Sequence, residues 1–140
     1  ALDVSIQAQV LNLLVDIQEE FKVSFIFVSH DLSVVEYISH RIIVMYLGTI
    51  VESGFTDDIC DRPNHPYTNA LLESIPRPEH GQRNRERNLL KGDVPSASKP
   101  IAGCPFSSRC PKIMPICLEA RPLLREISTG HLTACHLNNC

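Results

Sequence analysis

Four cysteines in the second half of the chain are the residues whose type and number most directly suggest chemistry. They are Cys104, Cys110, Cys117 and Cys135, and the gaps between successive members are five, six and seventeen residues long. Four thiolates are enough to ligate a [4Fe–4S] cluster or a structural metal ion, although this spacing lacks the C-x₂-C pairs of common zinc ribbons and fingers. Free thiols and disulfides stay open as alternatives, because spacing alone does not fix connectivity.

A histidine in the first half is the second candidate. His30 stands between Ser29 and Asp31, directly after the short apolar run of residues 23–28. If that run is a strand, His30 lies where the strand ends, and the ligand crevice of an open α/β sheet lies outside the carboxyl ends of its strands. The alternative is a histidine that only hydrogen-bonds within its loop.

The elements around His30 are expected to follow an α/β order. Asp3 can cap a helix whose apolar residues recur at helical spacing. They are Val10, Leu14, Ile17 and Phe21. Residues 23–28 are rich in β-branched and aromatic side chains, which suits a strand buried on both faces of a parallel sheet.

Downstream of His30 the sequence predicts a helix and then two strands. Asp31 is a good N-cap for a helix that runs to about residue 39, and residues 41–46 form another apolar run. Leu47-Gly48-Thr49 then leads into residues 50–52. So short a connection with a glycine favours an antiparallel hairpin.

Composition divides the chain near residue 62. Residues 1–62 contain no proline and have three Lys/Arg against ten Asp/Glu, a net charge of −7. Residues 63–140 contain all ten prolines and have ten Lys/Arg against six Asp/Glu, a net charge of +4. We therefore expect an α/β part over residues 1–62 and a small irregular, Cys/Pro-rich extension over residues 63–140.

Several functional classes fit the sequence poorly. No apolar run approaches the roughly 18 residues that span a bilayer, and the start of the chain does not resemble a signal peptide. A basic run, formed by Arg83, Arg85, Arg87 and Lys91, has no aromatic residue near it to stack on bases. We interpret that run as a solvated linker and expect no nucleic-acid partner. The rival hypothesis for the whole chain is a metal-stapled nucleic-acid or protein-binding module.

Several motifs together resemble one family. Residues 27–32 (Phe-Val-Ser-His-Asp-Leu) resemble the switch-histidine region of ATP-binding-cassette (ABC) ATPases, and Ala1-Leu2-Asp3 resembles their D-loop. Residues 44–52 and 65–72, the latter beginning His-Pro-Tyr, are similar to the ATPase subunits that energise dipeptide and oligopeptide import. The resemblance continues through residues 92–96, 103–106, 109–111, 130–131 and 134–136.

This resemblance implies roles for particular residues. The fold would be the C-terminal part of a P-loop NTPase core followed by the subfamily's extension. His30 would contact the γ-phosphate of Mg²⁺-bound ATP, and Asp3 would lie at the dimer interface. Cys104, Cys110, Cys117 and Cys135 would ligate an iron–sulfur cluster. The chain contains no G-x-x-x-x-G-K-[ST] motif to cradle phosphates, so by itself it is expected to be an inactive fragment whose upstream part is missing.

The resemblance also implies partners and a location. They are a second ABC ATPase subunit, two transmembrane permease subunits and, indirectly, an extracytoplasmic peptide-binding protein. The subunit would be peripheral, at the cytoplasmic face of the plasma membrane. Its expected activity is the ATP hydrolysis that drives peptide import.

Overall fold

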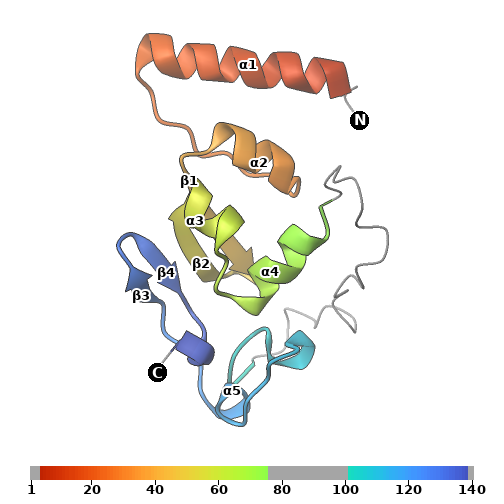
Figure 1. Ribbon diagram of the computed structural model, residues 1–140, viewed down its shortest axis with the longest axis vertical. Helices are drawn as coiled ribbons and strands as arrows, with labels where there is room; N and C mark the ends of the chain where they lie inside the picture. Colours follow the sequence, from red (N-terminus) through yellow and green to blue (C-terminus); the bar gives the residue numbers. More distant parts are fainter. Residues whose placement is uncertain (1–3, 76–100, 139–140) are drawn as a thin grey trace. The chain divides into compact units, whose positions relative to one another are not determined.

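The computed structural model describes residues 4–75 and 101–138 (Figure 1). They fall into two compact units, residues 1–39 and residues 40–140. Asp3 and the basic run at residues 83–91 lie outside the described residues. No helix in the described ranges is long and apolar enough to cross a membrane.

The first unit contains two helices, α1 (Val4–Phe21) and α2 (Leu32–Ile38). Both were predicted, and α2 has the predicted cap, because the Asp31 side chain accepts a hydrogen bond from the N–H of Ser33. The residue that follows α1, Lys22, is left-handed, with φ of 53°. Within α1 the predicted apolar stripe is not fully covered, since Val10 and Phe21 are exposed.

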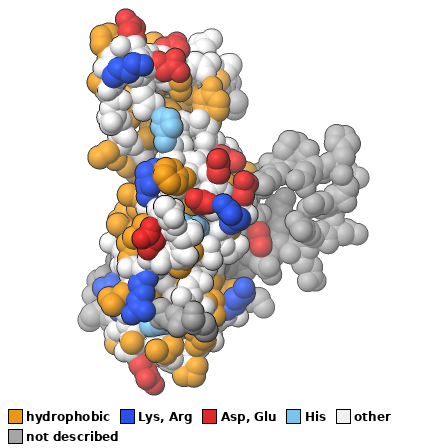
Figure 2. All heavy atoms as spheres, turned by 60° about the vertical axis from the view of Figure 1, so that its left-hand side comes forward, with side chains coloured by type: hydrophobic (Ala, Val, Ile, Leu, Met, Phe, Trp, Pro, Cys, Tyr) orange, Lys and Arg blue, Asp and Glu red, His pale blue; other side chains and the backbone are white. Residues whose placement is uncertain are grey.

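The predicted strand at residues 23–28 is absent. The segment forms no β-strand, and Ile26 and Val28 are 97% and 90% exposed. A strand needs a neighbour to hydrogen-bond with, and no strand among the described residues pairs with this segment. Hydrophobic side chains remain on the molecular surface as a result (Figure 2).

The second unit is built on a four-stranded antiparallel sheet in the order β1-β2-β4-β3. Its strands are β1 (Arg41–Tyr46), β2 (Thr49–Phe55), β3 (Arg125–Ser128) and β4 (His131–Thr133). β1 and β2 form the predicted hairpin. Leu47 and Gly48, the two residues of its turn, have φ of 45° and 73°, which is the left-handed pairing of a type I′ turn.

Four short helical segments and one longer helix accompany this sheet. They are α3 (Thr56–Asp61), α4 (Pro66–Glu73), η1 (Ser107–Arg109), α5 (Ile116–Glu119) and η2 (His136–Asn138). α4 covers most of the His-Pro-Tyr motif region at residues 65–72. Alternating burial along β1 turns Ile42, Val44 and Tyr46 into the core.

The segment after residue 100 differs from the irregular extension that was expected. It contributes β3 and β4, and β4 pairs with β2, so residues on both sides of position 62 share one sheet (Figure 1). The Thr and His side chains of β4 alternate inward and are buried, which is the period-2 pattern of a strand. The domain boundary near residue 62, drawn from composition, stays a prediction.

Candidate functional site

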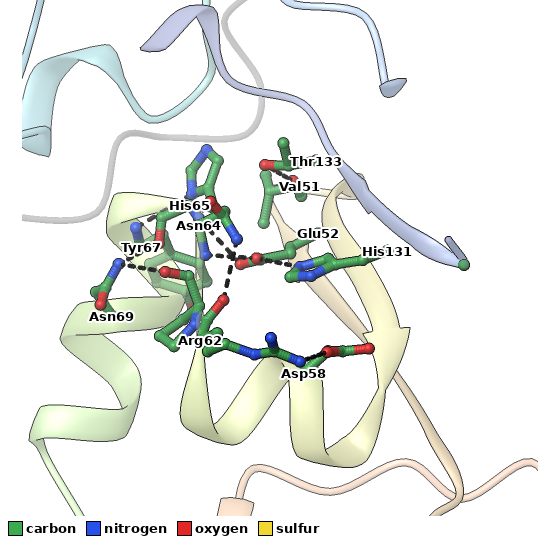
Figure 3. A network of polar contacts seen from close by, with 12 residues as sticks. Val51, Glu52, Asp58, Arg62, Asn64, His65, Tyr67, Asn69, His131 and Thr133 are labelled. Carbon is green, nitrogen blue, oxygen red and sulfur yellow. Dashed lines mark hydrogen bonds and ion pairs between the residues drawn. The ribbon is translucent and has the colours of Figure 1, made fainter. Parts of the chain in front are cut away.

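A buried carboxylate at the centre of the second unit joins three parts of the chain. Glu52 of β2 is fully buried. Its Oε1 accepts hydrogen bonds from the N–H of Asn64 at 2.7 Å and from Nε2 of His131 at 2.8 Å, and its Oε2 accepts one from the N–H of His65 at 3.1 Å (Figure 3). A buried carboxylate is stable only when its oxygens are hydrogen-bonded. Glu52 thereby holds the loop before α4 and the start of β4 against β2.

His65 caps α4 with its side chain. Its Nδ1 accepts a hydrogen bond from the N–H of Tyr67 at 3.1 Å, and the next residue, Pro66, opens the helix without needing a partner for an N–H group. Burial lowers the pKa of His65 to about 4, although the charge of Glu52 acts in the opposite direction. The imidazole is therefore neutral at pH 7, as an accepting Nδ1 requires.

Phe106 forms an aromatic cluster with the first turn of α4 and the end of β1. Its side chain is fully buried. Its ring centroid lies 5.2 Å from that of Tyr46, 5.4 Å from that of Tyr67 and 5.6 Å from that of His65. The His-Pro-Tyr motif thus has two structural tasks, since His65 starts the helix and Tyr67 packs on Phe106.

The cysteine segment is tied together through its backbone. The N–H of Cys104 donates to the carbonyl oxygen of Cys117 at 2.8 Å. A Cβ on Gly103 would lie 2.7 Å from the carbonyl carbon of Leu118, so this close approach of two backbone segments requires a glycine. Cys104 and Cys117 are therefore neighbours although twelve residues separate them in sequence.

The thiols of the predicted set influence one another. Burial raises the pKa of Cys104, Cys110 and Cys135, and charge on the neighbouring thiols raises each further. All four cysteines of the set are free. However, no group of three or more His, Cys, Asp or Glu side chains in the described ranges is positioned to hold a metal ion. The structure thus brings the four residues into one segment without supporting the predicted iron–sulfur cluster.

His30 lies in the other unit, two residues after the segment of residues 23–28. Its side chain is exposed. The loop around it is held by two hydrogen bonds, from the N–H of Asp31 to Ser29 Oγ and from the N–H of Ser33 to Asp31 Oδ1, each 3.0 Å long. The local backbone of His30 is thereby fixed while its imidazole stays accessible.

The roles of Glu52, His65 and His131 were not predicted from the sequence. One local signal was available for His65, because a polar residue directly before a proline and an apolar helical run is a typical N-cap pattern. For Glu52 and His131 no local signal exists, since their contact spans 79 positions. Together these residues form a structural junction, which we call the Glu52 junction.

Comparison with known proteins relates this junction to a family. The model of the "Oligopeptide/dipeptide transporter, C-terminal region" matches residues 51–117. Oligopeptide transport ATP-binding protein AppF of Bacillus subtilis is 51% identical over 138 residues, which is 98% of this chain and 42% of AppF. Residues 51–117 are thus similar to the C-terminal region of oligopeptide/dipeptide transporter proteins. The matched region starts beside Glu52 and includes His65 and Phe106, whereas His131 and Cys135 lie beyond it.

Two further relatives also carry names of peptide-transport ATP-binding proteins. A peptide import ATP-binding protein of Brucella ovis is 51% identical over 139 residues, which cover 99% of this chain and 44% of that protein. Dipeptide transport ATP-binding protein DppF of Haemophilus influenzae is 50% identical over 135 residues, 96% of this chain and 41% of DppF. The chain thus spans less than half the length of these transporter-family proteins. The rival hypothesis of a nucleic-acid or protein-binding module finds no support among them.

Proposed function

We propose that this chain is the C-terminal portion of an ATP-binding subunit that energises peptide import across the cytoplasmic membrane. The observation that carries the proposal is the identity of about one residue in two with peptide-transport ATP-binding proteins along 98–99% of the chain. Because the aligned region covers nearly the whole chain, it includes both the residues around His30 and the Glu52 junction. Hydrolysis of Mg²⁺-bound ATP would be the activity of the whole subunit.

His30 is the residue proposed to act on ATP. Its exposed imidazole, held on a loop fixed by Ser29 and Asp31, would contact the γ-phosphate and help hold the attacking water in line. Catalysis of phosphoryl transfer consists mainly of positioning and charge stabilisation, so one well-placed imidazole has a large effect. Asp3 is proposed to lie at the interface with a second ATPase subunit.

The other proposed partners follow from the same assignment. ATP hydrolysis would drive two transmembrane permease subunits, and an extracytoplasmic peptide-binding protein would deliver the peptide to them. The subunit itself would sit peripherally at the cytoplasmic face of the membrane. Residues 63–140 would form the extension of the nucleotide-binding domain, anchored to it through the Glu52 junction.

Cys104, Cys110, Cys117 and Cys135 are proposed to act as one set that takes a [4Fe–4S] cluster. The type and number of donors fit, because iron–sulfur clusters are held by four cysteine thiolates, but in the described ranges the thiols are not gathered around a metal position, so binding would require them to move together. A bound cluster would supply a structural cross-link to a proline-rich segment.

A chimeric transporter tests the main proposal. In it, this chain replaces the corresponding C-terminal part of Bacillus subtilis AppF, and uptake of a labelled oligopeptide is measured in cells that lack AppF. We expect the chimera to restore uptake and the His30→Ala chimera to fail. A matched chimera with His40→Ala, another exposed histidine, should behave like the parent. A properly folded chimera without uptake would contradict the proposal.

A further inference from the structure

Exposed aliphatic side chains are concentrated in one short segment of the second unit. Between residues 113 and 124, five large aliphatic residues are 40–69% exposed, namely Ile113, Ile116, Leu118, Leu123 and Leu124. Single exposed apolar residues are common on protein surfaces, whereas several together mark an interaction site. Hydrophobic side chains gather in Figure 2 at the end of this unit where Figure 1 shows α5.

Two buried residues hold this segment on the unit. Cys117 and Pro122 are buried, while the residues directly before and after each of them are exposed. The N–H of Ala120 donates to the carbonyl of Ile116 at 2.9 Å. α5 is a single turn about 6 Å long, so the exposed Ile116 and Leu118 are close neighbours. The aliphatic side chains are thus presented to solvent on a backbone that is fixed from within.

The charged residues of this segment are mostly basic. Residues 111–125 contain three Lys/Arg and one Asp/Glu, a net charge of +2, and all four are exposed, namely Lys112, Arg121, Arg125 and Glu119. A second exposed apolar segment, residues 23–28, lies in the first unit, where residues 4–39 have one Lys/Arg and five Asp/Glu, a net charge of −4. The two apolar segments therefore differ in the sign of the charge beside them.

This difference in sign distinguishes the partners that the two segments fit. An apolar surface bordered by basic side chains suits an anionic lipid surface, because the aliphatic groups enter the acyl boundary while the cations contact the headgroups. Each Lys or Arg near an anionic bilayer strengthens binding about fivefold. Residues 23–28 lie among acidic residues, which the same bilayer repels.

We propose that residues 111–125 form a lipid-contact surface that binds an anionic membrane. Ile116 and Leu118 would enter the interface, and Lys112 and Arg125 would contact the headgroups. The inference rests on the proposed peripheral location of the subunit, and it adds the surface by which this chain itself would contact lipid.

Vesicle sedimentation of the full 140-residue chain tests the inference. One set of vesicles is pure phosphatidylcholine, and the other contains about one third phosphatidylglycerol. We expect binding to the anionic vesicles to be about tenfold tighter at low salt, and high salt should remove most of this preference because it screens the basic side chains.

Substitutions at exposed positions separate the two contributions. Leu118→Gln should weaken binding to both kinds of vesicle about tenfold, because an aliphatic group no longer enters the interface. Lys112→Gln should weaken binding to the anionic vesicles alone, by about fivefold. Val28→Gln is the matched control, since Val28 is 90% exposed in the acidic unit, and should leave binding unchanged. An unaltered Tm shows that each variant is folded.

The chain contains no tryptophan, so a single introduced indole reports its own surroundings. The emission of Leu118→Trp should shift to the blue with anionic vesicles, and that of Val28→Trp should not. Absence of binding, equal affinity for the two vesicle compositions at low salt, or a shift confined to Val28→Trp would each overturn the inference.

Two further outcomes would also overturn it. Self-association that Leu118→Gln abolishes, without any vesicle binding, would assign the surface to a second copy of this chain. An AppF chimera that restores peptide uptake, while the chain binds no vesicles, would overturn the lipid-contact surface alone and leave the proposed function intact.

Discussion

Glu52 and His131 are 79 positions apart in sequence, yet Nε2 of His131 lies 2.8 Å from Oε1 of Glu52, with both side chains buried. An ionised carboxylate only accepts hydrogen bonds, so His131 donates. The same carboxylate oxygens accept from the backbone ahead of α4. One side chain therefore fixes both the late strand β4 and the helix with the His-Pro-Tyr motif onto the β1–β2 hairpin.

Glu52→Gln should destabilise the chain strongly. A glutamine has one oxygen acceptor and would turn its NH₂ group toward at least one of the three donors, which leaves a buried donor without a partner. We expect a loss of about 2–4 kcal/mol in the free energy of unfolding, measured by urea denaturation at pH 7. Glu126→Gln is the matched control, because Glu126 accepts one hydrogen bond from Gly130 in an exposed position. Equal losses in the two variants would contradict the role of Glu52.

The His65 cap predicts that the chain is less stable in mild acid. Burial lowers the pKa of His65 from 6.5 to about 4, so the unfolded chain takes up the proton more readily than the folded one. The contribution of His65 to the free energy of unfolding is fully present above pH 6.5 and is lost as the pH falls toward 4. The total loss is about 3 kcal/mol.

His65→Asn isolates this effect, since asparagine is also a good N-cap but does not titrate. The difference between wild type and variant in free energy of unfolding should shrink by about that amount between pH 7 and pH 4. His40→Asn serves as the control at an exposed position. A difference that is independent of pH would show that His65 is not buried as a neutral side chain.

Two glycines should respond differently to alanine. Gly103→Ala places a Cβ against the backbone of Cys117 and Leu118 and should cost about 3 kcal/mol, because a backbone segment would have to move. At Gly48 nothing lies near the added Cβ, but φ is +73°, so alanine there should cost about 1 kcal/mol. Urea denaturation of both variants checks the order, and the reverse order would refute the packing described around Gly103.

Local sequence patterns predicted the elements that are stabilised locally. Asp31 capped α2, and the Leu47-Gly48 turn joined β1 to β2, because capping and turn formation depend on residues a few positions apart. The strand expected at residues 23–28 does not form, because a strand depends on a pairing partner from a distant part of the chain. β4 and the Glu52–His131 contact were likewise not predictable, because both depend on which distant segments meet.

The four cysteines are expected to respond as one set. Protein made and purified without oxygen should be brown and contain iron and acid-labile sulfide, because four thiolates would hold the cluster. Cys→Ser at position 104, 110, 117 or 135 should diminish both contents, whereas Cys60→Ser and Cys140→Ser should not. Colourless protein with four titratable thiols would leave these residues as packing side chains.

ATP hydrolysis by the AppF chimera tests the central claim most directly. The chimera that carries this chain should hydrolyse ATP, and His30→Ala should reduce kcat by about 100-fold or more while ATP binding stays nearly unchanged, since the γ-phosphate contact matters most in the transition state. His40→Ala should leave kcat unaltered. A His30→Ala chimera with near-normal kcat would remove His30 from the reaction and contradict the proposed function of this chain.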